Sequence, residues 1–187
     1  MPLPNVTIRN ALESDVTPVT ELIHRSFQVW AQAGLRLGPM FQTDAQTSSH
    51  LLGKGVVALD QNDKIVGTFS LDDGFIAINS DRNIDFQEGA AITIFQVTAP
   101  AEIRSGKYLV FKKLAVCPSI GRSGLGLHFY QMAEKEARSA GYVGVVLETV
   151  REAQWLFHWY EKLGFLVIGT NRYPGSPIDT LLMIKNF

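Results

Sequence analysis

The stretch from Tyr108 to Ala140 constrains the fold more than any other part of the chain. Tyr108–Cys117 is an apolar run typical of a buried strand. A short turn with three glycines follows at Gly121–Gly126, and beyond it apolar residues recur at helical spacing. A strand that passes through a glycine-rich turn directly into a helix is typical of layered α/β folds. We therefore expect a protein in which helices pack against a sheet.

The remaining periodic segments also alternate between helices and strands. We expect helices near 16–30, 43–52 and 152–163, and strands near 6–9, 55–59, 64–71, 143–149, 165–170 and 180–184. Ser14 or Asp15 is placed to cap the first helix. The region 72–106 is the least regular, and within it only Ala91–Val97 has the pattern of a strand. No repeat or linker divides the chain, so we expect one domain over 1–187 with an insertion at about 72–106.

Composition and charge exclude several classes of partner. The 187 residues include 17 lysines and arginines against 18 acidic residues, a formal charge of −1. A chain without a cationic excess has no broad field for nucleic acid or an anionic membrane, and we expect neither as a partner. No apolar run approaches the roughly 20 residues that span a bilayer. The single cysteine, Cys117, allows no intrachain disulfide, which fits a reducing cytoplasm. The four histidines show no metal-ligand spacing, and we predict no metal site.

The glycine-rich turn has the position of a phosphate-binding loop. Glycines allow close backbone approach, and the first amides of the following helix point outward with the helix dipole behind them. A Walker loop would need Lys-Ser or Lys-Thr after the last glycine, but Leu127 and His128 follow Gly126. Glycines at the first, fourth and sixth places also differ from the dinucleotide fingerprint. A purely structural connection between strand and helix remains the alternative.

The turn resembles the acetyl-CoA pyrophosphate loop of the GNAT (Gcn5-related) N-acetyltransferase family. Gly124 and Gly126 match the last two defined positions of that loop, and Leu114–Pro118 resembles the family's strand ending in Val-x-Pro. Gly121 stands where the family has Arg or Gln, and the neighbouring Arg122 could supply the charge instead. The resemblance implies cofactor contacts from Leu114, Ala115, Val116, Gly121, Arg122, Ser123, Gly124, Leu125 and Gly126.

A second motif in the expected order strengthens this resemblance. Tyr160–Phe165 reads Tyr-Glu-Lys-Leu-Gly-Phe, a common signature of the same family. The pattern is nearest to the ribosomal-protein and peptide N-terminal alanine acetyltransferases, in which a strand-end glutamate precedes a helical tyrosine by twelve positions. Glu148 and Tyr160 keep that spacing, and Asn171–Pro174 resembles a stretch beside the peptide site. Ala153 replaces the usual asparagine at the helix start.

The resemblance implies a fold and a reaction. The fold is a mixed, mainly antiparallel sheet of six to seven strands flanked by helices. The reaction is direct attack of a primary amine on acetyl-CoA, the co-substrate, in a ternary complex. Glu148 would act as general base and Tyr160 as general acid, with a strand amide near Val116 stabilising the oxyanion. The alternatives are a strand-end carboxylate in a salt bridge for Glu148 and a core aromatic for Tyr160.

The acceptor and the assembly stay open at the level of sequence. In this family the loop after the first helix, here about 28–41, helps to build the acceptor pocket. That loop holds Trp30, Leu35 and Phe41 with Arg36 as its only charge. A peptide N-terminus, a polyamine or amino-sugar, and an amino acid all remain candidates, and a homodimer is one alternative for the assembly. The rival to an enzyme is a non-catalytic acyl-CoA-binding or regulatory module on the same fold.

Overall fold

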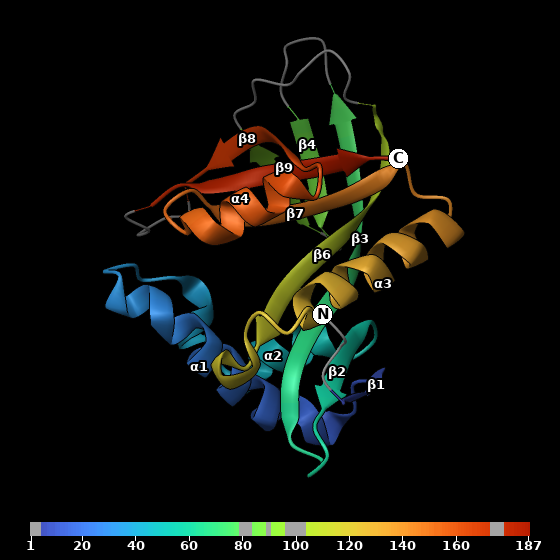
Figure 1. Ribbon diagram of the computed structural model, residues 1–187. Coiled ribbons are helices and arrows are strands. Elements are labelled where there is room, and N and C mark those ends of the chain that lie inside the picture. Colours follow the sequence, from blue (N-terminus) through green and yellow to red (C-terminus); the bar gives the residue numbers. More distant parts are fainter. Residues whose placement is uncertain (1–4, 79–83, 89–90, 96–103, 173–177) are drawn as a thin grey trace. The chain divides into compact units, whose positions relative to one another are not determined.

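The computed structural model describes residues 5–78, 84–88, 91–95, 104–172 and 178–187 (Figure 1). The helices of this part of the chain are α1 (Val16–Gln32), α2 (Asp44–Leu51), α3 (Leu125–Ser139) and α4 (Gln154–Lys162), with short 3₁₀ turns η1 (Glu13–Asp15), η2 (Gly38–Phe41) and η3 (Pro118–Ile120). The strands are β1 (Thr7–Asn10), β2 (Gly55–Leu59), β3 (Ile65–Ile78), β4 (Ile84–Glu88), β5 (Ala91–Phe95), β6 (Gly106–Val116), β7 (Gly144–Val150), β8 (Leu166–Asn171) and β9 (Thr180–Asn186).

The strands follow one another in the hydrogen-bonded order β1-β2-β3-β6-β7-β9-β8, and β4 and β5 extend from β3. The β6–β7 ladder is parallel, with Tyr108–Val110 opposite Gly144–Val146. The pairs β1–β2, β2–β3, β3–β4, β4–β5, β7–β9 and β8–β9 are antiparallel. The predicted mixed, mainly antiparallel sheet is therefore confirmed, with seven strands along its main path. The two added strands come from the region 72–106, where the sequence predicted one strand near Ala91–Val97.

The chain divides into two compact units. Unit 1 comprises residues 1–71 and 111–132, and unit 2 comprises residues 72–110 and 133–187. Three elements, β3, β6 and α3, contribute residues to both units. The expectation of one domain over 1–187 stays a prediction.

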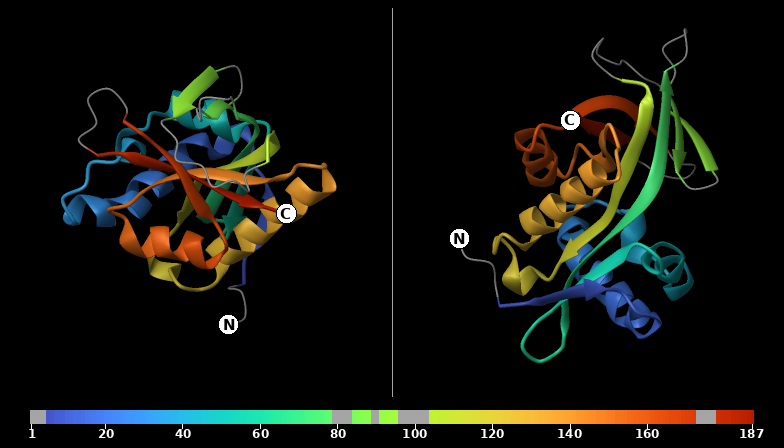
Figure 2. Two further views of the ribbon diagram at one scale, coloured as in Figure 1. Left: turned by 90° about the horizontal axis from the view of Figure 1, so that it is seen from above. Right: turned by 90° about the vertical axis from the view of Figure 1, so that its right-hand side faces the viewer.

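In unit 1, helices cover both faces of the strands β1 to β3. Figure 2 shows α1 and α2 on one face and the beginning of α3 on the other. The core on the α1 side consists of Val19, Leu22, Ile23, Leu51, Val57, Leu59, Ile65 and Ala115. On the α3 side the Phe69 ring lies 5.5 Å from the Phe111 ring and 4.9 Å from the Phe129 ring, between centroids. A Cβ at Gly67 would lie 2.8 Å from Leu125 and Phe129, so this glycine lets α3 approach β3 closely.

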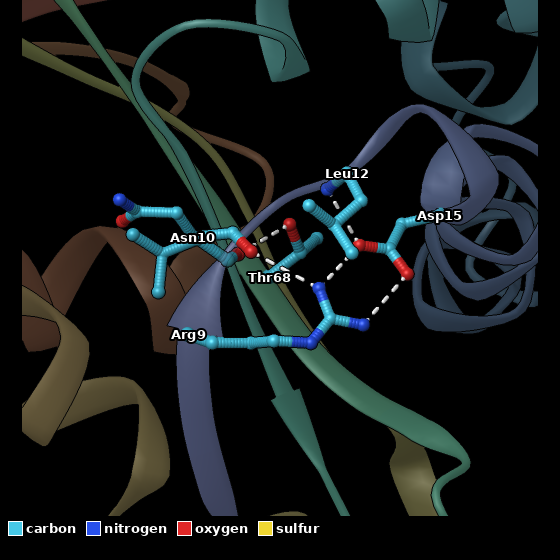
Figure 3. Close-up of polar contacts among 6 residues, drawn as sticks. Arg9, Asn10, Leu12, Asp15 and Thr68 are labelled. Atoms are coloured by element: carbon cyan, nitrogen blue, oxygen red, sulfur yellow. Dashed lines mark hydrogen bonds and ion pairs between the residues drawn. The ribbon is translucent and has the colours of Figure 1, made fainter.

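An ion pair fixes the beginning of α1 to β1 (Figure 3). Both guanidinium nitrogens of Arg9 donate to the Asp15 carboxylate, at 2.6 and 3.0 Å, and the Leu12 amide donates to the same carboxylate at 2.7 Å. Asp15 is the N-cap residue by position, as predicted, but its side chain accepts no hydrogen bond from the helix. The hydrogen bond from Arg9 is the main reason that the pKa of Asp15 is lowered.

In unit 2, β7 lies between β6 and β9, and α4 contacts β7. The core consists of Ile76, Tyr108, Val110, Val146, Ile168, Leu182 and Ile184. A Cβ at Gly144 would overlap the carbonyl oxygen of Lys185, so β7 and β9 could not pair as they do with a larger residue there. The Tyr142 hydroxyl donates to Asp73, and Lys107 lies 3.8 Å from the same carboxylate. The Asp73 carboxylate in β3 and the Tyr142 hydroxyl beside β7 therefore both have polar partners.

Candidate active site

The glycine-rich turn lies in unit 1, between η3 and the first residue of α3. Three hydrogen bonds shape the chain before it: Ile120 N to Cys117 O at 3.0 Å, Gly121 N to Pro118 O at 3.1 Å, and Ser123 N to Ile120 O at 3.3 Å. Two residues within it have positive φ, Arg122 at 62° and Gly124 at 87°. The helix then begins at Leu125, with its first amides directed outward as in any helix. The turn therefore lies directly before a helix N-terminus, the kind of position at which anions bind in many proteins.

The two glycines differ in what their positions demand. Gly124 has a φ that L side chains rarely adopt, although a Cβ there would meet open space. Gly121 has a φ of −54°, which any residue adopts, and a Cβ there would lie 3.2 Å from Pro118 O. The departure from the family pattern at Gly121 therefore has no cause in backbone conformation. Arg122 is exposed beside it.

The predicted cofactor-binding residues differ in how far solvent reaches them. Ala115 and Leu125 are buried; Leu114, Val116, Ser123 and Gly126 are half-buried; Gly121, Arg122 and Gly124 are exposed. The buried members belong to the core of unit 1 and support the loop. The exposed ones form the surface that a phosphate group could reach.

The backbone at the end of β6 is held from two sides in unit 1. The Cys117 amide donates to Val66 O at 2.8 Å, and the Ser26 hydroxyl of α1 donates to Val116 O at 3.0 Å. The N–H and C=O of one strand residue point to the same side, and those of the next residue point to the other. A strand amide near Val116 was predicted to stabilise the oxyanion, and the amide of Val116 itself points to the side on which Ser26 lies. Sequence reasoning missed Ser26, because no local pattern connects residues 90 positions apart.

Glu148 lies in unit 2, in the middle of β7. It is exposed, whereas Leu147 and Thr149 on either side are buried. The Thr180 hydroxyl of β9 donates to its Oε1 at 3.4 Å. Glu148 is the one exposed residue of β7, so solvent reaches its carboxylate.

Tyr160 lies on α4 in the same unit and is 5% exposed. Its ring packs against those of Trp159 and Phe165, with centroids 4.9 and 5.7 Å away. Burial raises the pKa of the phenol above its ordinary value. A raised pKa keeps the hydroxyl protonated at neutral pH, as a general acid requires, but makes it a weaker acid.

The helix α4 begins directly after Ala153, the residue that replaces the usual asparagine of the resembled family. Ala153 is the N-cap, 1% exposed, and its carbonyl accepts from the amides of Leu156 and Phe157 at 2.9 Å each. Alanine has no side-chain oxygen to bind the free amides of the first turn, so this helix start lacks a side-chain cap. Of the stretch 171–174, Arg172 pairs with Asp179 at 2.6 Å, and positions 173 and 174 lie outside the described residues.

The two predicted catalytic residues thus lie in one unit, and the predicted cofactor-binding residues lie in the other. Glu148 and Tyr160 lie in unit 2 on β7 and α4, which contact each other. The glycine-rich turn belongs to unit 1. Among the described residues, no group of three His, Cys, Asp or Glu could hold a metal ion. No helix in the described part of the chain is long and apolar enough to cross a membrane.

With this geometry in place, the family assignment is direct. A family model described as "Acetyltransferase (GNAT) family" matches residues 17–165, which include the glycine-rich turn, Glu148 and Tyr160. The chain belongs to the GNAT acetyltransferase family. A search of curated proteins finds no sequence match.

Solved structures share the fold at low sequence identity. A GNAT-family acetyltransferase from Streptococcus agalactiae has a TM-score of 0.71 and 15% identity, over 100% of this chain and 98% of its own. The PaiA N-acetyltransferase from Thermoplasma acidophilum, solved with coenzyme A, has a TM-score of 0.63 and 15% identity, over 98% and 99%. The ribosomal-protein-S18-alanine N-acetyltransferase from Escherichia coli has a TM-score of 0.62 and 16% identity, over 97% and 93%.

Proposed function

We propose that the protein is a cytoplasmic N-acetyltransferase that transfers an acetyl group from acetyl-CoA to a primary amine. The observation that carries this proposal is the family match over 17–165, because the matched region contains the glycine-rich turn and the Glu148–Tyr160 pair in the order in which the motifs of the resembled family occur. The positive φ values at Arg122 and Gly124 before the first turn of α3 support pyrophosphate binding there. The coenzyme A complex of the Thermoplasma relative agrees with this cofactor.

In the proposed reaction the amine nitrogen forms a bond to the thioester carbon, and the carbon–sulfur bond then breaks. The acceptor enters as an ammonium ion and loses one proton before attack and another as the tetrahedral intermediate collapses. Glu148, directly or through a water, takes protons from the nitrogen and releases them to solvent. Tyr160 gives its proton to the departing thiolate and regains one, so the products are an amide, free CoA and one net proton. The Val116 amide stabilises the oxyanion.

Tyr160→Phe tests the mechanism. The variant removes only the phenol oxygen, so we expect acetyl-CoA binding to persist while kcat falls by about 100-fold or more, the scale of general acid catalysis. Tyr142→Phe, which removes a hydroxyl bonded to Asp73 in the same unit, is the matched control and should keep its activity. An unchanged kcat in Tyr160→Phe would remove this residue from the mechanism.

The second candidate function is a non-catalytic acyl-CoA-binding or regulatory module. Two observations favour it: Gly121 offers no side chain to the pyrophosphate, and Ala153 offers no cap at α4. Calorimetric titration with acetyl-CoA, with ATP and NAD as controls, is the first measurement. Selective binding followed by free-thiol release with an amine panel of peptides, polyamines and amino acids supports the enzyme. Binding without release across the panel supports the module, and no binding of acetyl-CoA by folded protein removes both.

A further inference from the structure

A buried chain of polar side chains joins α1, α2 and β3 in unit 1. Thr20, Gln42, Thr47 and Ser70 are each at most 5% exposed, and His50 is half-buried. Thr47 Oγ1 lies 2.7 Å from Thr20 Oγ1 and 2.7 Å from Gln42 Nε2. Gln42 Nε2 also lies 2.8 Å from His50 Nε2, and His50 Nδ1 lies 3.1 Å from Ser70 Oγ. Burial of this many polar groups is favourable only when every hydrogen atom has an acceptor.

The direction of each hydrogen bond in this row of side chains can be deduced by starting from Thr20. Thr20 Oγ1 has two neighbours that can only accept, Val16 O at 3.0 Å and the Asp44 carboxylate, so its single hydrogen does not go to Thr47. Thr47 must then donate its hydrogen to Thr20, so the Thr47 oxygen accepts from Gln42. Gln42 therefore turns its amide nitrogen, which has two hydrogens, toward both Thr47 and His50. The Nε2 atom of His50 accepts the second of these hydrogens and has no proton of its own.

His50 is thus held in the neutral tautomer with its proton on Nδ1, and it donates that proton to Ser70. Burial, and after it the positive charges of Lys113 and Lys112, lower the pKa of His50 to about 4. A proton added at Nε2 would face the Gln42 amide hydrogens. The amide would then have to turn over, and Thr47 would lose its donor.

The chain holds the backbone next to an exposed aromatic residue. The main-chain oxygen of Gln42 lies 2.8 Å from His24 Nε2, so Gln42 is held by both its side chain and its backbone. The preceding residue, Phe41, is 58% exposed, and the guanidinium of Arg36 lies 5.1 Å from its ring centre. The other titratable group at this end of α2 is Asp44, which is exposed and accepts from Thr17.

We infer that Gln42, Thr47 and His50 are positioning residues that fix the segment 38–43, and with it Phe41, for contact with the acceptor amine. The role in acceptor contact rests on the proposed function and on the family resemblance, which implies that the loop of about 28–41 helps to build the acceptor pocket; the held segment and the tautomer of His50 do not depend on either. Neutral His50 is the form that fixes the segment. Protonated His50 releases it, because Gln42 then has to turn its amide over.

The variant Gln42→Glu reverses the hydrogen bond between residue 42 and His50, because a carboxylate has nearly the shape of the amide but can only accept. A carboxylate at this position faces the bare Nε2 of His50, so His50 takes up a proton there at neutral pH. Thr47 can donate to that carboxylate only by giving up its hydrogen bond to Thr20, so one buried hydrogen bond is lost. The matched control is Gln46→Glu on α2. Gln46 is exposed and closes the capping box with Thr43, a place where glutamate serves equally well.

Nitrogen NMR of histidine-labelled protein reports the tautomer directly, with His24, His128 and His158 as internal references. We expect a protonated Nδ1 and a bare Nε2 at His50 in the parent and in Gln46→Glu, and two protonated nitrogens in Gln42→Glu. Amide hydrogen exchange over 38–47 should be at least about tenfold faster in Gln42→Glu than in the control, the effect of losing one buried hydrogen bond. A protonated Nε2 in the parent, or equal exchange in the two variants, would overturn the inference.

Kinetics then separate this inference from the proposed function. The acceptor for this test is an amine with which the parent protein releases free CoA. We expect Gln42→Glu to raise the KM for that amine about tenfold. Its binding of acetyl-CoA should equal that of Gln46→Glu. Equal KM values in the two variants would overturn the positioning role. Failure of the parent to transfer acetyl groups would remove the proposed function, while the NMR and exchange results would still decide whether the chain holds the segment. If Gln42→Glu does not fold, Thr47→Val removes the same acceptor and replaces it in the exchange experiment.

Discussion

At the scale of single residues, the backbone angles of the glycine-rich turn show which of its residues the conformation requires and which it does not. Gly124 and Arg122 both have positive φ, but only Gly124 is a residue that adopts it without strain. Arginine in the left-handed region costs about 1 kcal/mol. Gly121, with a φ of −54°, carries no such constraint. The positive φ of Arg122 lowers stability, and the φ of Gly121 does not require a glycine. We therefore expect the charge of Arg122 to contribute to ligand binding and not to stability.

Replacement of Arg122 by glycine tests that suggestion. We expect Arg122→Gly to be more stable by about 1 kcal/mol, because the strain is relieved, and yet to bind acetyl-CoA more weakly. Urea unfolding and calorimetry measure the two effects. Gly124→Ala is the comparison variant, since it introduces strain without changing any charge and should lose about 1 kcal/mol. Undiminished acetyl-CoA affinity in Arg122→Gly would mean that Arg122 does not substitute for the family's Arg or Gln.

At the scale of helices and strands, period and motif predicted most of the fold, and long-range contacts account for the misses. The sequence predicted a strand over about 64–71, because the region after it, 72–106, shows the least regular pattern. The strand β3 instead continues to Ile78, and Asp73 finds its partners far along the chain in Tyr142 and Lys107. Tertiary contacts of this kind override local preference, and no local pattern reveals them.

The candidate site divides in the same way. Glu148 and Tyr160 were predicted from the family resemblance, whose motif lies within one strand and the next helix, and their roles stay predictions. Ser26 and the chain through His50 could not be found, since each contact joins segments that the sequence gives no reason to pair. Gly67 had a usable signal, because an isolated glycine inside a strand marks a close approach of another element.

The α1–α2 layer of unit 1 should be sensitive to acid through His50. Its folded pKa of about 4 lies below the ordinary 6.5, so the unfolded chain binds the proton more readily. Stability from this group is complete above about pH 6.5, falls as the pH decreases to about 4, and is constant below that. Because solvent reaches part of the ring, the loss is on the order of 1 to 2 kcal/mol.

His50→Gln should flatten the stability curve in that window, as followed by urea unfolding at a series of pH values. Asp15 acts in a separate window, because its lowered pKa makes its contribution disappear only as the pH falls below about 3.9. Asp15→Asn is therefore the control and should leave the slope between pH 6.5 and 4 unchanged. A slope in His50→Gln equal to that of the parent would contradict the assignment to this histidine.

At the scale of the whole molecule, the open question is whether the two units unfold together. The chain runs from one unit to the other within β3, within β6 and within α3, not through linkers. A strand or helix that is cut at its middle loses the hydrogen bonds that continue it, so unfolding of one unit should destabilise the elements that it shares with the other. We therefore predict a single cooperative transition.

The three tryptophans provide separate reporters of that transition. Trp30 lies in unit 1, and Trp155 and Trp159 lie in unit 2. With fluorotryptophan incorporated, fluorine NMR follows each residue during urea unfolding, and we expect all three signals to change with the same midpoint and the same slope. Gly67→Val in unit 1 and Gly144→Val in unit 2, each of which forces a close contact apart, should lower all three midpoints together. A Trp30 signal that changes at a different urea concentration from the other two would show two independently folding units and would contradict the prediction of one domain.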